Sequence, residues 1–215
     1  MKTFLFTIYS VILMMISCQS NAQTYTIETS LGTIQVKLYE ETPLHKENFE
    51  KLVAEQFYDG VLFHRIIAGF MIQTGDGATK VDPNGEAAGV YLDYTVPAEF
   101  IPEYFHKKGV LAAARTGDAV NPEKRSSGSQ FYIVQGRTYV DAELDQIEER
   151  LPTKFSESQR EIYKTIGGTP FLDQNYTVFG EVVKGLEVVD AIAALPTGPR
   201  DFPITDIRIL RIVKD

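Results

Sequence analysis

Short apolar stretches separated by glycine, proline and polar turn residues recur along the chain, and they constrain its fold more than any other feature. In one stretch, Ile34, Val36 and Leu38 alternate with polar residues, which is typical of a strand with one buried face. The preceding Leu31-Gly32 pair indicates a hairpin tip. The pattern alone leaves an antiparallel sandwich and a closed barrel equally open. The strands are predicted over 24–28, 32–39, 109–114, 130–134, 177–183 and 207–213.

Two other stretches have the spacing of helices. Thr42 and Pro43 suit the N-cap and the first position of a helix that runs to about Glu55. The residues expected on its buried side are Leu44, Phe49, Leu52 and Val53. A second, shorter helix is predicted over 186–194, before Pro196. The pattern therefore predicts a mainly β domain with two covering helices.

The first 22 residues are predicted to lie outside the folded domain, which would then span 23–215. Lys2 precedes an uninterrupted apolar run, Phe4–Ile16, that suits a signal peptide and is too short to cross a bilayer. The small residues at Ser20 and Ala22 favour cleavage before Gln23. Alternatively, Met15-Ile16-Ser17-Cys18 resembles a bacterial lipobox, with cleavage before Cys18 and lipidation of this only cysteine. Either route predicts an exported bacterial protein, periplasmic or lipid-anchored at the cell envelope.

Composition excludes several classes of partner. The net charge is −8 and no run of basic residues is present, which argues against nucleic acid or an anionic membrane as a partner. His45, His64 and His106 are widely spaced and form no zinc motif, so we expect no metal. The sequence contains no phosphate-binding loop, dinucleotide fingerprint or nucleophile elbow. We therefore expect no cofactor and no hydrolase chemistry.

The most informative stretch covers 63–77, where an arginine stands inside an apolar run. Arg65 lies either at a strand edge with its charged head in water, or in the wall of a pocket. In the second interpretation Arg65 offers fixed donors and Gln73 an amide donor and acceptor, while Phe70 and Met71 form an apolar floor.

This stretch resembles the active-site signature of the cyclophilins, a family of peptidyl-prolyl cis-trans isomerases. Two further blocks match in the family's order, namely Leu111–Arg115 with Gly128–Ile133, and Phe171–Asp173 with Val178–Gly180. The resemblance extends from Thr24 to the C-terminus. It implies a closed eight-stranded antiparallel barrel with a helix over each opening. It also implies an enzyme that rotates Xaa-Pro bonds of proline-containing polypeptides without a cofactor.

The resemblance also implies a role for each site residue. Arg65 would donate toward the prolyl nitrogen and weaken the C–N double bond, and Gln73 would orient Arg65 and contact the substrate backbone. The other matching positions would bind substrate: Phe70, Met71 and Leu172 around the proline ring, Gln130 beside it, and Ala114 and Arg115 along the residues before proline. His64 is expected to be a structural histidine with satisfied hydrogen bonds.

Three candidate substrate-binding positions depart from the best-studied eukaryotic pattern. Tyr132 replaces Phe, Phe171 replaces Trp and Tyr176 replaces His. The Tyr132 hydroxyl predicts a slightly more polar pocket, and the change to Phe171 predicts weaker binding of cyclosporin. Plain core packing is the alternative role of each ring.

A segment at about 137–169 has no counterpart in the smallest cyclophilins. One helix is predicted over 141–151, and another over 156–166 with a capping box formed by Ser156 and Gln159. We interpret the segment as an inserted helical hairpin. The hairpin would pack against the barrel, extend the peptide groove or bind a partner.

Two functions fit these observations. The first is a prolyl isomerase that assists the folding of exported proteins. The second is a proline-peptide binding module or chaperone with little catalysis. Arg65 and Gln73 favour the first, because binding alone does not need the arginine. Nothing in the sequence indicates an obligate partner, so a monomer is expected.

Overall fold

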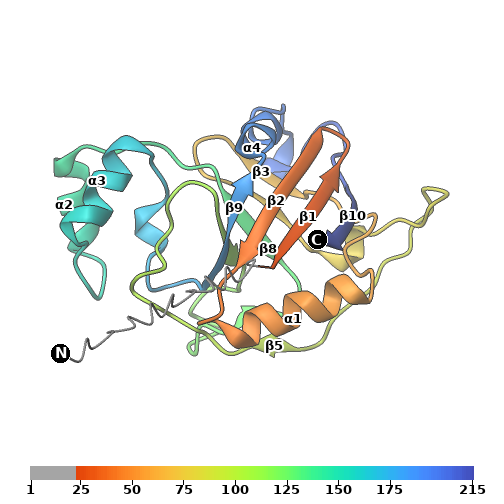
Figure 1. The fold of residues 1–215 in the computed structure, drawn as a ribbon, viewed down its shortest axis with the longest axis horizontal. Coiled ribbons are helices and arrows are strands. Elements are labelled where there is room, and N and C mark those ends of the chain that lie inside the picture. Colours follow the sequence, from red (N-terminus) through yellow and green to blue (C-terminus); the bar gives the residue numbers. More distant parts are fainter. Residues whose placement is uncertain (1–22) are drawn as a thin grey trace, which may run out of the picture.

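In a computed structural model, which describes residues 23–215, eight strands form one curled antiparallel sheet (Figure 1). The predicted signal peptide and Cys18 lie outside the described residues. The strand order is β10-β1-β2-β9-β6-β8-β4-β3, and β5 and β7 form a separate small sheet. The strands are β1 Thr24–Thr29, β2 Gly32–Leu38, β3 Arg65–Ile67, β4 Met71–Thr74, β5 Thr95–Val96, β6 Val110–Ala113, β7 Ser126–Ser127, β8 Phe131–Val134, β9 Val178–Lys184 and β10 Ile209–Lys214. The helices are α1 Pro43–Ala54, α2 Asp141–Glu148, α3 Glu157–Thr165 and α4 Leu186–Ala193, with 3-10 turns η1 Gly77–Thr79, η2 Pro170–Leu172 and η3 Pro199–Asp201.

The predicted strands are present, with small shifts at their ends. Thr29 lies opposite Gly32 in the β1–β2 pair, so Ser30 and Leu31 form the turn of the predicted hairpin. The alternation in β2 corresponds to its buried face, which consists of Ile34, Val36 and Leu38. Such period-two burial is what a sheet with one covered face requires.

Backbone hydrogen bonds also connect chain segments that lie next to the two edge strands of the sheet. The segment before β3 bonds to the segment at the start of β10. The Gly60 N–H donates to the Ile209 carbonyl and the Phe63 N–H donates to the Ile207 carbonyl, both at 2.8 Å. Much of the hydrogen-bonding capacity of the two edge segments is therefore used within the molecule.

Helices α1 and α4 lie at opposite ends of the curled sheet (Figure 1). Phe49 and Leu52 of α1 and Val189 and Ile192 of α4 are buried in one core with the inward-facing strand residues. Each helix thus covers one end of the apolar interior, as the sequence predicted. This arrangement leaves the outer surface of the strands free to form a site.

The start of α1 differs from the prediction. Leu44 is 44% exposed and His45 is buried in its place. The Thr42 hydroxyl does not cap the helix. Instead the Glu99 carboxylate, remote in sequence, accepts from the backbone N–H of Leu44 at 3.1 Å and of His45 at 3.0 Å. A carboxylate suits this position because it satisfies free N–H groups and complements the helix dipole.

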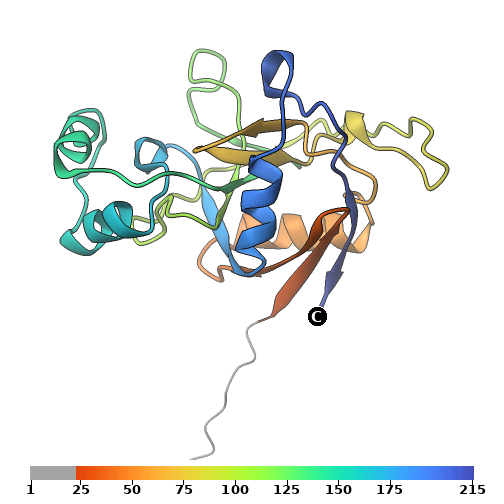
Figure 2. The same ribbon diagram turned by 90° about the horizontal axis from the view of Figure 1, so that it is seen from above.

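The predicted helical hairpin is present and lies to one side of the sheet in both views (Figures 1 and 2). Helix α2 ends at Glu148, short of the predicted residue 151, where the Glu148 carboxylate accepts from the Phe155 N–H at 3.0 Å. The capping box is confirmed, with Ser156 and Gln159 bonding to each other's backbone N–H. After α3, a Cβ on Gly168 would lie 2.1 Å from the His106 carbonyl oxygen, so only glycine permits this approach to the sheet.

Candidate active site

The predicted site residues converge on one cavity of about 240 Å³ on the outside of the sheet. All nine residues that line it belong to the predicted set. Gln130 and Phe171, the other two members of that set, lie at its margin. The lining consists of Arg65, Phe70, Met71, Gln73, Ala114, Arg115, Tyr132, Leu172 and Tyr176, and we call this cavity the proline pocket.

Strand register explains why these side chains meet. Arg65 on β3 lies opposite Gln73 on β4, and Gln73 lies opposite Tyr132 on β8. Met71 is two residues before Gln73 on the same strand. Because side chains two residues apart share a face and cross-strand partners are neighbours, four pocket residues come from one small area of sheet.

Arg65 has a different partner from the one predicted. Its Nε donates to the Asp201 Oδ2 at 3.3 Å, and no hydrogen bond to Gln73 occurs. Arg65 is 42% exposed, so the ion pair is open to solvent. Arg200 and Asp201 both have a φ of 61°, a left-handed conformation that is uncommon outside glycine. Sequence reasoning missed Asp201 because it lies 136 residues from Arg65 and no local pattern marks it.

Gln73 is bound to the second candidate glutamine. Its Nε2 donates to the Gln130 Oε1 at 3.0 Å. Gln130 directly precedes β8, and its carbonyl accepts from the Ala114 N–H at 2.9 Å. The two amides are therefore held together at the end of the pocket where Ala114 lies. They offer polar groups for the backbone of a bound peptide.

A buried polar chain leads from the pocket to the helical hairpin. The Tyr132 hydroxyl lies 3.0 Å from His106 Nε2, and His106 Nδ1 lies 2.7 Å from an Asp173 carboxylate oxygen. The Tyr163 hydroxyl of α3 donates to the other Asp173 oxygen at 2.6 Å. Burial raises the pKa of both tyrosines well above the usual value, so both remain protonated donors. The Tyr132 hydroxyl is thus used inside the protein and does not make the pocket more polar, contrary to the prediction.

The wall opposite β4 comes from the segment that contains η2. Leu172 and Tyr176 line the pocket, and the Arg115 guanidinium stacks 4.5 Å from the centre of the Tyr176 ring. Arg115 Nε also donates to the Asn175 carbonyl at 2.8 Å. Phe171 is 46% exposed, so it is a rim residue and not part of the core.

His64, the histidine of the signature stretch, lacks one of the hydrogen bonds that were predicted for it. His64 Nδ1 is buried and has no hydrogen-bond partner within residues 23–215. Burial lowers the pKa of His64, which keeps the ring neutral at neutral pH. No group of three or more His, Cys, Asp or Glu residues within this range is arranged to hold a metal ion. In the same range, no helix has the length and apolar character needed to cross a membrane.

The fold and the pocket together define a mainly β protein with one cavity, lined by both apolar and polar side chains, on the outside of its sheet. The model of the cyclophilin type peptidyl-prolyl cis-trans isomerase family matches residues 24–214. This chain therefore belongs to the cyclophilin-type peptidyl-prolyl cis-trans isomerase family.

Several bacterial relatives match this chain over most of their own length. A protein assigned as a peptidyl-prolyl cis-trans isomerase in Staphylococcus haemolyticus is 34% identical over 194 residues, which cover 89% of this chain and 90% of the relative. Its counterpart in Staphylococcus saprophyticus is 35% identical over 186 residues, covering 85% and 87%. These relatives support an isomerase as the function of the whole described domain.

Solved structures agree with the fold. A cyclophilin type peptidyl-prolyl cis-trans isomerase from Cryptosporidium parvum superimposes with a TM-score of 0.63 at 26% identity, covering 90% of this chain and 97% of the other. A second crystal structure of that protein, in the presence of the dipeptide Ala-Pro, has a TM-score of 0.62 at 26% identity and covers 89% and 98%.

Proposed function

We propose that this isomerase binds Xaa-Pro segments of polypeptides in the proline pocket and that Arg65 is its electrostatic catalyst. The observation that supports the proposal is the placement of the Arg65 guanidinium in the wall of the same cavity as the apolar side chains of Phe70, Met71 and Leu172. Met71, Tyr132 and Leu172 provide surface for the proline ring. The Cryptosporidium parvum relative crystallised with Ala-Pro is consistent with such a ligand.

The chemistry needs no covalent step. Rotation about a prolyl bond must overcome a barrier of about 20 kcal/mol that arises from amide resonance. A donor aimed at the prolyl nitrogen favours the twisted amide, in which the nitrogen lone pair is localised. Arg65 suits this role because a guanidinium remains charged and has a rigid fork of donors. Within residues 23–215, Asp201 engages only Nε, which leaves the two terminal nitrogens for substrate.

Gln73, Gln130, Ala114 and Arg115 would bind the peptide backbone before the proline. Ala114 directly follows β6 and is buried beside the two glutamine amides. An extended peptide laid along such a strand end gains main-chain hydrogen bonds as well as pocket contacts. Tyr176, stacked on Arg115, would close the side of the pocket.

The setting of this activity is also part of the proposal. The apolar segment at the N-terminus supports export from a bacterial cytoplasm, followed by cleavage before Gln23 or lipidation at Cys18. The substrates would then be exported proteins in the course of folding. Mass spectrometry of protein extracted from membranes tests this point, since an unmodified N-terminus at Gln23 rules out the lipoprotein.

Two structural expectations complete the proposal. The hydrogen bonds between the segments before β3 and at the start of β10 support a sheet that closes into a barrel. We also propose a monomer, because the predicted residues that line the pocket meet within a single copy of the chain, so the site needs no second copy. Sedimentation analysis of the 23–215 domain would measure the oligomeric state.

The decisive experiment measures the cis-to-trans rate of an Ala-Xaa-Pro-Phe peptide with the domain and with its Arg65→Ala variant. We expect the wild type to accelerate isomerisation and the variant to lose about 10²-fold or more of kcat/KM, the scale of losing one oriented charge donor. Gln73→Ala should lose less. If the wild type binds proline peptides without accelerating them, the protein is a recognition module and the proposed catalysis is refuted.

A further inference from the structure

A second cavity, of about 460 Å³, lies between α2 of the helical hairpin and the turn η2. Its lining is mixed, with apolar side chains from both elements and cationic or amide groups from the hairpin. We call it the hairpin groove. The lining residues used below are Arg137, Gln146, Ile147, Arg150, Leu151 and Phe171.

The hairpin groove and the proline pocket are lined by neighbouring residues of η2. Leu172 lines the pocket, whereas its neighbour Phe171 lines the groove. The Phe171 ring packs 5.6 Å from the ring of Phe70, which is another pocket residue. A polypeptide leaving the pocket past Phe70 would therefore pass Phe171, which lines the groove.

Strand register sets the direction of such a polypeptide. Ala113 of β6 and Thr74 of β4 both lie opposite Phe131, at one end of β8. Met71 lies opposite Val134, at the other end of β8. Ala114 and Phe70, which directly flank these strand ends, therefore lie at opposite ends of the pocket. If the residues before proline lie along Ala114, the residues after proline leave over Phe70 toward the groove.

The two walls of the groove are held in place before any ligand binds. Asp173 follows Leu172 directly and accepts hydrogen bonds from Tyr163 of α3 and from the His106 ring and backbone. All three residues are buried. A preformed groove saves the entropy that ordering a loop on binding would cost.

The groove carries an excess of positive charge. Arg137 pairs with Glu143 at 2.8 Å and stacks 3.9 Å from the centre of the Tyr139 ring. Arg150 lies just after α2, is exposed, and takes part in none of the ion pairs within residues 23–215. The groove therefore has one unneutralised cation beside apolar surface from Ile147, in a chain whose net charge is −8. Such a site favours a carboxylate next to an apolar side chain.

We propose that the hairpin groove is a binding site for the substrate segment that follows the proline, with a preference for an acidic residue next to an apolar one. An extended chain advances about 3.3 Å per residue, so residues a few positions after the proline would lie in the groove. The groove thereby makes the isomerase selective among proline sites by their downstream sequence. This inference rests on the proposed function of the proline pocket.

The test uses three peptides whose exchange between cis and trans is measured by NMR. The short peptide, Ala-Ala-Pro-Phe, ends one residue after proline. Two longer peptides extend it by Ala-Leu-Glu-Glu or by Ala-Leu-Lys-Lys. The variant Arg150→Glu reverses the charge in the groove. Lys154→Glu is the control, because it makes a similar charge change at an exposed position of the same hairpin that does not line the groove.

For the wild type we expect kcat/KM to be about 2- to 5-fold higher for the acidic long peptide than for the short one, the scale of a partly screened ion pair. The basic long peptide should show no gain. Arg150→Glu should abolish or reverse the difference in kcat/KM between the acidic and the basic long peptide. It should leave kcat/KM for the short peptide unchanged. Lys154→Glu should keep the wild-type order.

Failure of the inference is distinguishable from failure of the proposed function. If the wild type accelerates the short peptide but treats all three alike, the groove does not bind substrate and the inference is overturned. It is also overturned if Arg150→Glu keeps the preference for the acidic peptide, or if Lys154→Glu loses it. If the short peptide is not accelerated at all, the proposed catalysis fails, and the groove proposal fails with it.

Discussion

The core of the sheet and the helical hairpin are stabilised by different interactions. In the sheet core, Phe49 of α1 packs edge-on against Tyr25 and Phe131, each at 5.7 Å between ring centres, within a large set of buried apolar side chains. The hairpin buries only Tyr139, Leu144 and Tyr163 in a cluster of its own.

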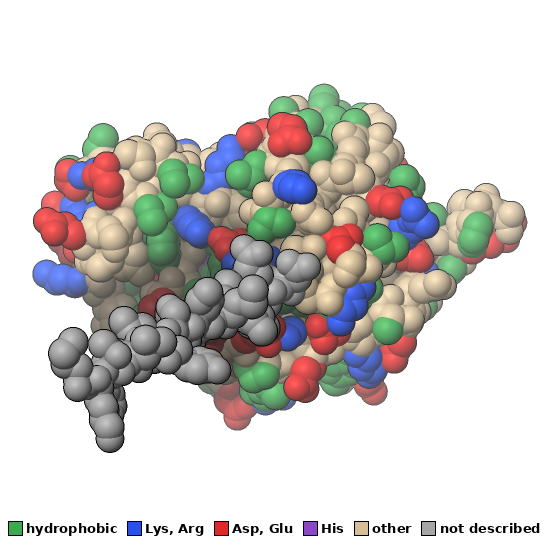
Figure 3. All heavy atoms as spheres, in the orientation of Figure 1, with side chains coloured by type: hydrophobic (Ala, Val, Ile, Leu, Met, Phe, Trp, Pro, Cys, Tyr) green, Lys and Arg blue, Asp and Glu red, His purple; other side chains and the backbone are tan. Residues whose placement is uncertain are grey.

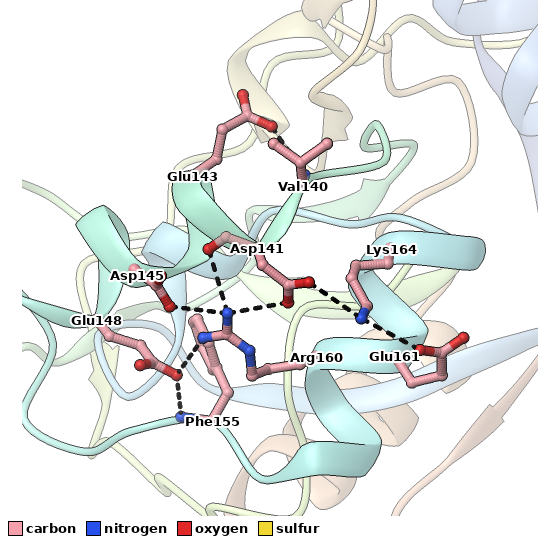
Figure 4. A network of polar contacts seen from close by, with 9 residues as sticks. All are labelled: Val140, Asp141, Glu143, Asp145, Glu148, Phe155, Arg160, Glu161 and Lys164. Atoms are coloured by element: carbon pink, nitrogen blue, oxygen red, sulfur yellow. Dashed lines mark hydrogen bonds and ion pairs between the residues drawn. The ribbon is translucent and has the colours of Figure 1, made fainter.

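Ion pairs make up much of the remaining contact between the two helices of the hairpin. Arg160 of α3 lies between Asp141 at 3.0 Å, Asp145 at 2.8 Å and Glu148 at 3.2 Å, all on or at the start of α2 (Figure 4). Acidic and basic side chains are also interspersed over the visible surface of the hairpin (Figure 3). Because exposed ion pairs stabilise weakly and salt screens them, the hairpin should open before the sheet does.

The largest effect is expected from Phe49→Ala. The substitution removes a fully packed ring and leaves a cavity, so the free energy of unfolding should fall by about 3–5 kcal/mol. Urea denaturation followed by far-UV circular dichroism measures it. A loss below about 1 kcal/mol would mean that the sheet core does not depend on close packing around α1, and the contrast with the hairpin would disappear.

A smaller and more local effect is expected from Tyr163→Phe. It removes the hydroxyl that donates to the buried Asp173 carboxylate, at a cost of about 1–3 kcal/mol. Amide hydrogen exchange should speed up in α2, α3 and the η2 segment, while amides of β1 and β2 stay protected. Tyr132→Phe is the control, since it cuts the same polar chain at its pocket end and leaves both Asp173 oxygens bonded. Equal exchange patterns in the two variants would contradict the idea that Tyr163 anchors the hairpin.

Arg160→Met should destabilise the hairpin by only about 1 kcal/mol or less, because its ion pairs are partly exposed. The effect should shrink between 0.05 M and about 0.5 M salt, over which screening removes most of the attraction. Hydrogen exchange of α2 amides at the two salt concentrations is the measurement. An effect that is independent of salt would assign the role of Arg160 to packing of its aliphatic stem.

The smallest effect is expected in the pH dependence of the free energy of unfolding, and it arises from His45, which is buried against the sheet core. Burial lowers the pKa of His45, and the nearby Glu99 only partly opposes this. The unfolded state, with an ordinary histidine pKa of about 6.5, therefore takes up the proton first. The free energy of unfolding should be level above about pH 7.5 and fall as the pH drops through 6.5.

Replacing His45 tests whether the free energy of unfolding changes with pH in this direction. His64, whose pKa is also lowered by burial, contributes in the same direction, so His45→Gln should flatten the slope between pH 7.5 and pH 6 only in part. Urea denaturation at a series of pH values gives the slopes. Stability that rises as the pH falls in this window would mean that Glu99 dominates and that His45 is charged in the folded protein.

Local sequence patterns determined the elements of this protein. Period-two alternation located β1 and β2, and the Ser156–Gln159 capping box located the start of α3, because both signals depend on residues close together in the chain. The signature stretch also located four of the nine residues that line the pocket. Arg65, Met71 and Gln73 share one face because β3 and β4 form a tight hairpin, a contact between near neighbours.

Only the tertiary structure decided what each of these residues contacts. Asp201 beside Arg65, Glu99 at the start of α1, and the chain from Tyr132 through His106 and Asp173 to the hairpin join residues far apart in sequence. Such pairs leave no periodic signal, since their partners are set by how whole elements pack and not by propensity or spacing. The same reason explains why the position of Phe171, between the pocket and the hairpin groove, became visible only in the fold.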